Sequence, residues 1–430
     1  MSNENHVAGN DGFDPSKVQK LSFTEILKRI GPGIILTGVV IGPGNITTSA
    51  MIGANYGYGL LWLIIPILLM GVTFMLTSYR ISMLTGMPIL HAIRHYYGGA
   101  AAGFCGIALF LSCLFFTLGN VSGTGAGMNL IFGINWKLGA LIMLAVLLGL
   151  YFSKGVYSKV EKGIMICIAG MILAFYATLV ATGGPAWGEM GKGLVKWSLP
   201  EGSMTTALAY ISTNAAVTAG IYGTYLGAEK KWKKEDLFNG AMKWDAVAHI
   251  VTVILISGAI MLVGAIVLNP QGIAIQAPAQ LAELLVPFLG GAAKYVMGIA
   301  LLGAGFSSLL GNTQRGMVLL SAGFDKDVAL ESKIIRWGCV ASLAFACVIC
   351  FIYDGSPTQL IFIANIATSI ATPVAGLFIM LMFWKTEVQG GLKPPRVLQV
   401  LMTVSYCFTL LMTVSALGNY IPKLIQSFSK

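Results

Sequence analysis

Long apolar stretches recur along the 430-residue sequence and are separated by short charged segments. Each stretch approaches or exceeds the roughly 20 residues that an α-helix needs to cross the hydrocarbon core of a bilayer. Apolar residues make up 56% of the chain and charged residues only 10%, against roughly 25% charged residues in an ordinary soluble domain. So few charges cannot cover the surface of a soluble protein of this length. The sequence therefore predicts an all-α polytopic membrane protein.

The apolar stretches predict about eleven transmembrane helices. Their approximate limits are 31–56, 58–84, 101–133, 137–153, 162–183, 204–228, 244–268, 292–321, 334–353, 357–384 and 397–422. The stretch 277–290 is too short to cross a bilayer and predicts a helix at the membrane interface.

Basic residues predict the orientation of the chain. Most of the 27 Lys and Arg residues fall on one side when the N-terminus is placed inside, which is typical of cytoplasmic loops. We expect a multi-pass protein of the cell inner (plasma) membrane with a cytoplasmic N-terminus. The net charge of +10 is then explained by topology and by contact with membrane lipids, without a nucleic-acid partner. The run Lys230, Lys231, Lys233 and Lys234 is interpreted as a solvated cytoplasmic loop.

The seven cysteines all lie within or beside apolar stretches. Cys347 and Cys350 form a C-x-x-C pair, but the pair falls inside a predicted membrane helix. Buried cysteines commonly behave as small hydrophobic side chains. We therefore interpret the pair as structural rather than as a redox or zinc site, and no cofactor is expected.

Two of the predicted spans are interrupted. In the first span the apolar run stops at Gly42-Pro43-Gly44-Asn45, where proline and glycine favour an unwound backbone. The sixth span carries a softer break over residues 214–220. Spans 1 and 6 are corresponding members of two five-helix halves, and such a pair is typical of inverted-repeat transporters with a mid-membrane substrate site. The alternative is that these glycines only pack helices in a channel or structural membrane protein.

This interpretation divides the chain into four parts. They are 1–30, an N-terminal tail with the start of helix 1; 31–183, a first repeat of helices 1–5; 204–384, a second repeat of helices 6–10; and 397–430, helix 11 with the C-terminal tail.

Several motifs resemble the NRAMP divalent-metal transporters. They are Gly31-Pro32-Gly33, Gly42-Pro43-Gly44-Asn45, Gly57-Tyr58-Gly59-Leu60-Leu61-Trp62 and Thr85-Gly86 in the first two helices, Asn129-Leu130-Ile131-Phe132-Gly133 in the third and Pro373 in the tenth. The resemblance covers essentially all eleven spans. It implies a LeuT-like inverted repeat with helices 1 and 6 broken, and a transporter rather than an enzyme.

The metal-binding motifs of that family are only partly present. The family's first-helix motif is Asp-Pro-Gly-Asn, and this chain has Gly42 at the Asp position while Asn45 is kept. The family's sixth-helix Met and Pro-His fall near Gly220-Ile221-Tyr222, so both the Met and the His are replaced. The tenth-helix Gln corresponds to Asn365. The sites of the NRAMP-related magnesium transporters also depart from the metal motif. This chain therefore resembles that branch of the family.

The family's proton pathway is replaced by neutral residues. Its third-helix acidic pair falls on Thr117 and Asn120, and Tyr222 stands at the sixth-helix His position. All 17 acidic residues lie in tails, loops or helix ends, whereas ion and proton pathways usually carry ionisable groups within the membrane. His249 is interpreted as a structural, hydrogen-bonded residue. We therefore expect no proton coupling.

The candidate substrate-binding residues lie at the two breaks and on the tenth helix. They are Gly42, Asn45, Thr48, Asn214, Ala216, Thr218, Gly220 and Asn365. Asn45 is the one candidate metal ligand among them. For each of these residues, hydrogen bonding between helices is the alternative role.

These substitutions predict the substrate class. A pocket without sulfur or carboxylate gives no preference for late transition metals, and Mg²⁺ keeps several waters when it is bound. We expect alternating-access transport of a hydrated divalent cation, Mg²⁺ before Mn²⁺, by a monomer. The alternative is a neutral or zwitterionic small organic solute without metal transport. A sensor or scaffold is a third reading, but no extra soluble domain supports it.

Overall fold

The computed structural model describes residues 13–152, 156–215 and 217–428, and every regular element in that part of the chain is helical. The first ten helices are α1 (Phe23–Arg29), α2 (Pro32–Val40), α3 (Pro43–Tyr56), α4 (Ile64–Thr85), α5 (Ile89–Phe132), α6 (Trp136–Phe152), α7 (Val156–Ala181), α8 (Trp187–Val195), α9 (Met204–Asn214) and α10 (Val217–Glu229). The others are α11 (Lys234–Phe238), α12 (Ala241–Val263), α13 (Pro278–Glu283), α14 (Val286–Leu289), α15 (Ala293–Gly323), α16 (Lys333–Ile352), α17 (Pro357–Ala367), α18 (Ala371–Trp384) and α19 (Arg396–Phe428).

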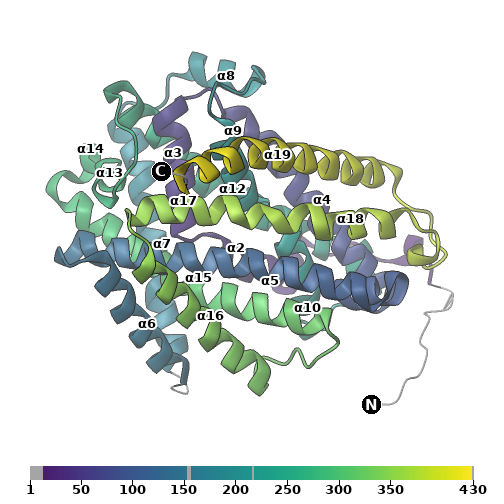
Figure 1. The fold of residues 1–430 in the computed structure, drawn as a ribbon. Coiled ribbons are helices and arrows are strands. Elements are labelled where there is room, and N and C mark those ends of the chain that lie inside the picture. The colour runs from purple at the N-terminus through teal and green to yellow at the C-terminus, as the bar shows by residue number, and fades with distance from the viewer. Residues whose placement is uncertain (1–12, 153–155, 216, 429–430) are drawn as a thin grey trace.

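Seven helical segments of the described residues are long and apolar enough to cross a membrane. They are Leu61–Thr85, Ile89–Phe132, Ala241–Gln271, Val286–Gly323, Lys333–Ile352, Pro357–Trp384 and Arg396–Gly418. Two shorter apolar helices, Trp136–Phe152 and Ile168–Ala181, occupy predicted spans 4 and 5. Half-helices α2–α3 and α9–α10 occupy spans 1 and 6. The all-α polytopic architecture is therefore confirmed, and Figure 1 shows α17 and α18 running between α5 and α19.

Some boundaries differ from the prediction. Helix α5 begins at Ile89, before the predicted start of span 3, and bends at Gly98, whose φ is 89°. The predicted interfacial helix over 277–290 is two short helices, α13 and α14. Helix α8 was not predicted. Its Gly193 packs closely on the segment between α3 and α4, where an added Cβ atom would lie 2.1 Å from the Tyr58 carbonyl oxygen.

The Gly31-Pro32-Gly33 motif anchors the first half-helix to α12. The backbone N–H groups of Gly31 and Gly33 donate to the two carboxylate oxygens of Asp245, each at 2.9 Å. The Tyr79 hydroxyl donates to the same carboxylate at 3.1 Å. A carboxylate at a helix N-terminus satisfies free N–H groups and interacts favourably with the helix dipole. The Asp245 carboxylate therefore has a structural role, which is to hold the start of α2 against α12.

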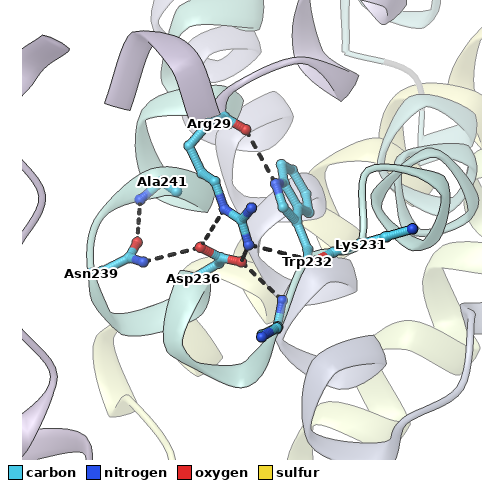
Figure 2. Close-up of polar contacts among 7 residues, drawn as sticks. Arg29, Lys231, Trp232, Asp236, Asn239 and Ala241 are labelled. Atoms are coloured by element: carbon cyan, nitrogen blue, oxygen red, sulfur yellow. Dashed lines mark hydrogen bonds and ion pairs between the residues drawn. The ribbon is translucent and has the colours of Figure 1, made fainter. Parts of the chain in front are cut away.

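A second anchor lies outside the spanning segments, between α1 and α11 (Figure 2). The Arg29 guanidinium donates to both oxygens of Asp236, with Nε 2.9 Å from Oδ1. The Asn239 side-chain amide and the Lys233 backbone N–H donate to the same carboxylate at 3.0 and 2.9 Å, and the Trp232 indole donates to the Arg29 carbonyl oxygen. Burial raises the pKa of Asp236, but these donors more than offset burial and lower the pKa below its ordinary value.

The Asp236→Asn variant should loosen α1. Removing a charged hydrogen-bond acceptor costs about 1–3 kcal/mol, so limited proteolysis should cut the α1 segment faster than in the wild type. Because the folded-state pKa of Asp236 is lowered, the carboxylate stabilises the fold above the ordinary value of 3.8 and loses that effect as the pH falls through the lowered pKa. Glu235→Gln, an exposed charge change on the same helix, is the control. Equal cleavage of both variants would contradict a specific contact.

Helices α3 and α12 cross with their backbones in contact. A Cβ atom on Gly53 would lie 2.0 Å from the Met261 carbonyl oxygen, and one on Gly264 would lie 2.8 Å from the Ala50 carbonyl oxygen. Small residues allow this close approach between membrane helices. The crossing fixes α3, and with it one side of the first-span break.

We expect Gly53→Ala to lower the thermal stability of the protein. The added methyl meets rigid backbone, and overpacking of this kind costs about 1–3 kcal/mol or more. The control is Gly258→Ala on α12, where the nearest atom to an added Cβ is the Ile64 Cδ1 at 3.6 Å. Thermal unfolding of both detergent-solubilised variants measures the difference. Equal melting temperatures would contradict this account of the crossing.

Candidate functional site

Both predicted breaks are present. Helix α2 ends at Val40, Gly42 is extended with φ −124° and ψ 179°, and α3 begins at the next residue. Helix α9 ends at Asn214, Ala215 is non-helical with φ −124° and ψ 38°, and α10 begins at Val217. The predicted site residue Ala216 lies outside the described residues. Any residue can adopt the Gly42 torsions, so space rather than backbone strain limits what stands there.

The two breaks are joined by polar side chains. The Asn45 amide donates to the Asn214 Oδ1 at 2.9 Å, and the Asn214 amide donates to the Tyr210 carbonyl oxygen at 2.7 Å. The hydroxyls of Thr48 and Thr213 lie 3.5 Å apart. The structure therefore brings together three predicted candidates, Asn45, Thr48 and Asn214.

Asn365 of α17 completes this group from a third side. Its side-chain amide donates to the Gly44 carbonyl oxygen at 3.0 Å, and its backbone carbonyl oxygen accepts from the Ser212 hydroxyl at 3.0 Å. A Cβ atom on Gly44 would lie 2.6 Å from the Asn365 Oδ1. Gly44 is therefore needed for the approach of Asn365 to the first break.

Asn120 of α5 lies at the same break. A Cβ atom on Gly42 would lie 2.6 Å from the Asn120 Oδ1 and 2.8 Å from the Ser308 Oγ. The Asn120 side chain is fully buried and neither of its amide atoms has a hydrogen-bond partner among the described residues. Asn120 was predicted only as a replaced proton-pathway residue, and the structure adds it to the group at the break.

Four buried oxygen atoms around the breaks lack a hydrogen-bond partner within the described chain. They are the Oδ1 atoms of Asn45, Asn120 and Asn365 and the Oγ1 of Thr218. Buried polar atoms are nearly always paired, because leaving one unpaired costs about 1–3 kcal/mol. Amide and hydroxyl oxygens are ligands that suit hard cations and their bound waters. In the described residues no group of three or more His, Cys, Asp or Glu side chains is placed to hold a metal ion.

A family model described as natural resistance-associated macrophage protein-like (Nramp) matches residues 33–418. The chain belongs to the Nramp family. Members of this family are divalent-metal transporters and not enzymes.

Relatives and solved structures agree with this assignment. The divalent metal cation transporter MntH of Agrobacterium fabrum is 26% identical over 388 residues, which cover 86% of this chain and 82% of that protein. The crystal structure of the Eremococcus coleocola manganese transporter with an aromatic bis-isothiourea compound matches with a TM-score of 0.75 at 17% identity, covering 94% of this chain and 90% of that one. MhsT in complex with L-phenylalanine matches with a TM-score of 0.58 at 16% identity, covering 93% and 100%. The predicted LeuT-like fold is confirmed.

Three predicted residues of this Nramp chain make no hydrogen bond to the group among the described residues. A Cβ atom on Gly220 would lie 2.9 Å from the Phe74 carbonyl oxygen, so Gly220 serves the packing of α10 on α4. The Thr117 hydroxyl donates to the Cys113 carbonyl oxygen of its own helix at 2.9 Å. Tyr222 is buried on α10.

His249 has the hydrogen bond that the sequence analysis expected. Its Nδ1 lies 2.8 Å from the Thr37 Oγ1, and that hydroxyl also donates to the Gly33 carbonyl oxygen at 2.8 Å. His249 therefore holds α2 against α12 beside the Asp245 anchor.

Sequence reasoning missed the contribution of α15 to this Nramp site. The Ser308 hydroxyl donates to the Val39 carbonyl oxygen at 3.0 Å, with the Ile41 carbonyl oxygen at 3.3 Å, and the Asn312 amide lies 3.2 Å from the Val39 oxygen. These bonds satisfy carbonyl groups left free where α2 ends. The available signal was the spacing of Ser308, Asn312 and Arg315, which places three polar residues on one face of an apolar helix.

Proposed function

We propose that this Nramp-family protein transports a hydrated divalent cation, with Mg²⁺ as its substrate, by alternating access and without proton coupling. The observation that carries the proposal is the set of amide oxygens of Asn45, Asn120 and Asn365 at the break. Among the described residues these oxygens have no hydrogen-bond partner, and the contacts found for the three side chains include no carboxylate or sulfur. Mg²⁺ gives up its waters reluctantly. A neutral oxygen-lined site suits it, because the oxygens can accept hydrogen bonds from the bound waters.

We propose that the substrate site is formed by Asn45, Thr48, Asn120, Asn214, Thr218 and Asn365, with backbone groups at Gly42 and Ala216. A bare divalent ion in this neutral site would lose its hydration without gaining a counter-charge. Retained waters avoid that cost. They also explain how a family of divalent-metal transporters can include a chain with Gly42 at the acidic position.

The proposal that transport is uncoupled from protons also rests on the absence of charged side chains among the residues proposed for the site. Thr117 and Asn120 stand where the family resemblance places an acidic pair, and Asp245 is held by backbone N–H groups at the start of α2. Neither arrangement supplies a carboxylate that can pick up and release a proton at the break. The proposed setting is a monomer in the plasma membrane with a cytoplasmic N-terminus and repeats over 31–183 and 204–384.

Flux into proteoliposomes tests the proposal. We expect saturable Mg²⁺ uptake, no marked preference for Mn²⁺ or Cd²⁺ over Mg²⁺, and no acidification of the lumen reported by an enclosed pH-sensitive dye. Protein-free liposomes are the control. Low-micromolar Cd²⁺ binding or cation-driven proton entry would contradict the proposal, because soft-metal preference needs a soft ligand. Uptake of amino acids without any divalent-cation flux would favour an organic solute instead.

A further inference from the structure

Arg315 is a buried arginine within the membrane-spanning part of α15. Its side chain is 1% exposed, and it lies about 12 Å along the helix from the end of α15 at 1.5 Å per residue. Its Nη2 donates to the Asn312 Oδ1, whereas its Nε and Nη1 have no hydrogen-bond partner among the described residues. None of the ion pairs found between described side chains includes Arg315.

Side chains of α5, α10 and α12 lie near the guanidinium, and α15 packs along α5 (Figure 1). The Phe116 ring of α5 lies with its centroid 6.0 Å from the Arg315 Cζ. The Cys113 thiol of α5 lies within hydrogen-bonding range of the guanidinium, and Tyr222 of α10 and His249 of α12 are near enough to feel its charge. None of these three side chains carries a negative charge at neutral pH in its usual state. None of these neighbours among the described residues therefore offers a counter-ion.

An uncompensated guanidinium is energetically unfavourable in this position. Arginine keeps its charge in proteins, and a buried charge is tolerated only when it is paired and hydrogen-bonded. Within a membrane-spanning segment such a residue usually marks a functional site. The unpartnered Nε and Nη1 groups are charged donors on opposite edges of the planar guanidinium, and each can donate to an acceptor. The missing partner is therefore an acceptor that carries negative charge.

We propose that Arg315 binds a small monovalent anion, either chloride or the carboxylate of a small organic acid, among α5, α10, α12 and α15. The site lies on the same face of α15 as Ser308, further toward the end of the helix. Asn312, which holds the Arg315 Nη2, also donates toward the Val39 carbonyl oxygen where α2 ends. Ser308 at the break lies two turns along α15, about 10 Å from Arg315 along the axis.

This position gives the anion a role in cation passage, which rests on the proposed function. Arg315 lies between Ser308 at the break and the end of α15, so we infer that a divalent cation leaving the break on that side experiences its charge. The guanidinium alone would repel it, because charge interactions are strong where water is scarce. A bound monovalent anion neutralises the guanidinium and removes that barrier. Binding of the anion itself does not depend on which cation is transported.

Equilibrium binding of ³⁶Cl⁻ to the full-length protein in nanodiscs tests the site. The buffer contains EDTA and gluconate at constant ionic strength, so the readout is separate from cation transport. We expect saturable binding to the wild type and a loss of affinity of roughly tenfold or more in Arg315→Gln, the effect of removing a charged donor pair. Arg336→Gln, which changes an exposed arginine of the next helix, should bind as the wild type does.

Two further measurements make the test decisive. Cys113→Asp should place a carboxylate beside the guanidinium and abolish chloride binding. This variant keeps Arg315, so the test still works if Arg315→Gln fails to fold. Competition by formate separates a carboxylate site from a halide site: strong competition by formate identifies the carboxylate, and weak competition identifies chloride. Absence of saturable binding of both anions to the wild type would overturn the proposal. Unchanged binding in folded Arg315→Gln or Cys113→Asp would do the same.

Discussion

The Asn120→Asp variant should bind Mn²⁺ roughly tenfold or more tightly than the wild type, because carboxylate charge strengthens divalent-cation binding. Asn120 is fully buried, its Oδ1 lies at the Gly42 break, and its amide makes no hydrogen bond to another described residue that the substitution would break. Aspartate has nearly the same shape as asparagine. The substitution therefore adds a charge to the site and little else. Isothermal titration of the purified variant with Mn²⁺ and Mg²⁺ measures the gain.

The same substitution should make binding depend on pH. Protonation of the new carboxyl in acid removes the charge, so the gain in affinity should disappear as the pH is lowered. The control is Asn129→Asp, which adds the same charge near the end of the same helix, where the Asn129 amide donates to the Ile134 carbonyl oxygen. A folded Asn120→Asp protein with the affinity of the wild type would show that Asn120 does not face a bound cation. It would favour the organic-solute alternative.

The second large effect is expected for Gly44→Ala, which should reduce Mg²⁺ uptake about tenfold or more, since small displacements of binding groups can cost a hundredfold. The added methyl would lie 2.6 Å from the Asn365 Oδ1 and 3.0 Å from its Nδ2. Asn365 must then move away from the first break, and its hydrogen bond to the Gly44 carbonyl oxygen is lost. Uptake of ²⁸Mg²⁺ into proteoliposomes gives the rate.

Gly38→Ala is the matched control for this prediction. It adds the same methyl to the same span, but the nearest atom to the new Cβ is the Ser307 Oγ at 3.8 Å. We expect uptake close to that of the wild type. Equal loss of uptake in both variants would indicate a general intolerance of the first span to larger residues, and would remove Asn365 from the proposed site.

The sequence predicted the all-α membrane architecture and both breaks, because long apolar runs and the Gly-Pro-Gly pattern act locally. It also placed Asn45, Thr48, Asn214 and Asn365 in one group, which the hydrogen bonds and contacts of the structure join. Local rules were sufficient for Asn45, Thr48 and Asn214 because these residues sit at or near a break, whereas Asn365 was indicated by the family resemblance.

The orientation of helices about their axes was not predictable in the same way. Gly220 was grouped with Thr218, yet two residues along a helix are turned about 200° apart, so the two face opposite sides. Asn120 was separated from the break because nothing in the sequence shows which face of α5 meets α3. Arg315 contributed to the sequence argument only as one of the 27 basic residues, since its burial depends on the packing of four helices.

The attachments of α2 at its two ends have a kinetic consequence. At its start, Gly31 and Gly33 are bonded to Asp245 of α12, and at its end the Val39 carbonyl oxygen is bonded to Ser308 of α15. A helix of about 14 Å that is bonded at both ends cannot move as a rigid body without breaking the contacts at one end or at both. We therefore expect these polar contacts to contribute to the activation barrier of the proposed alternating access.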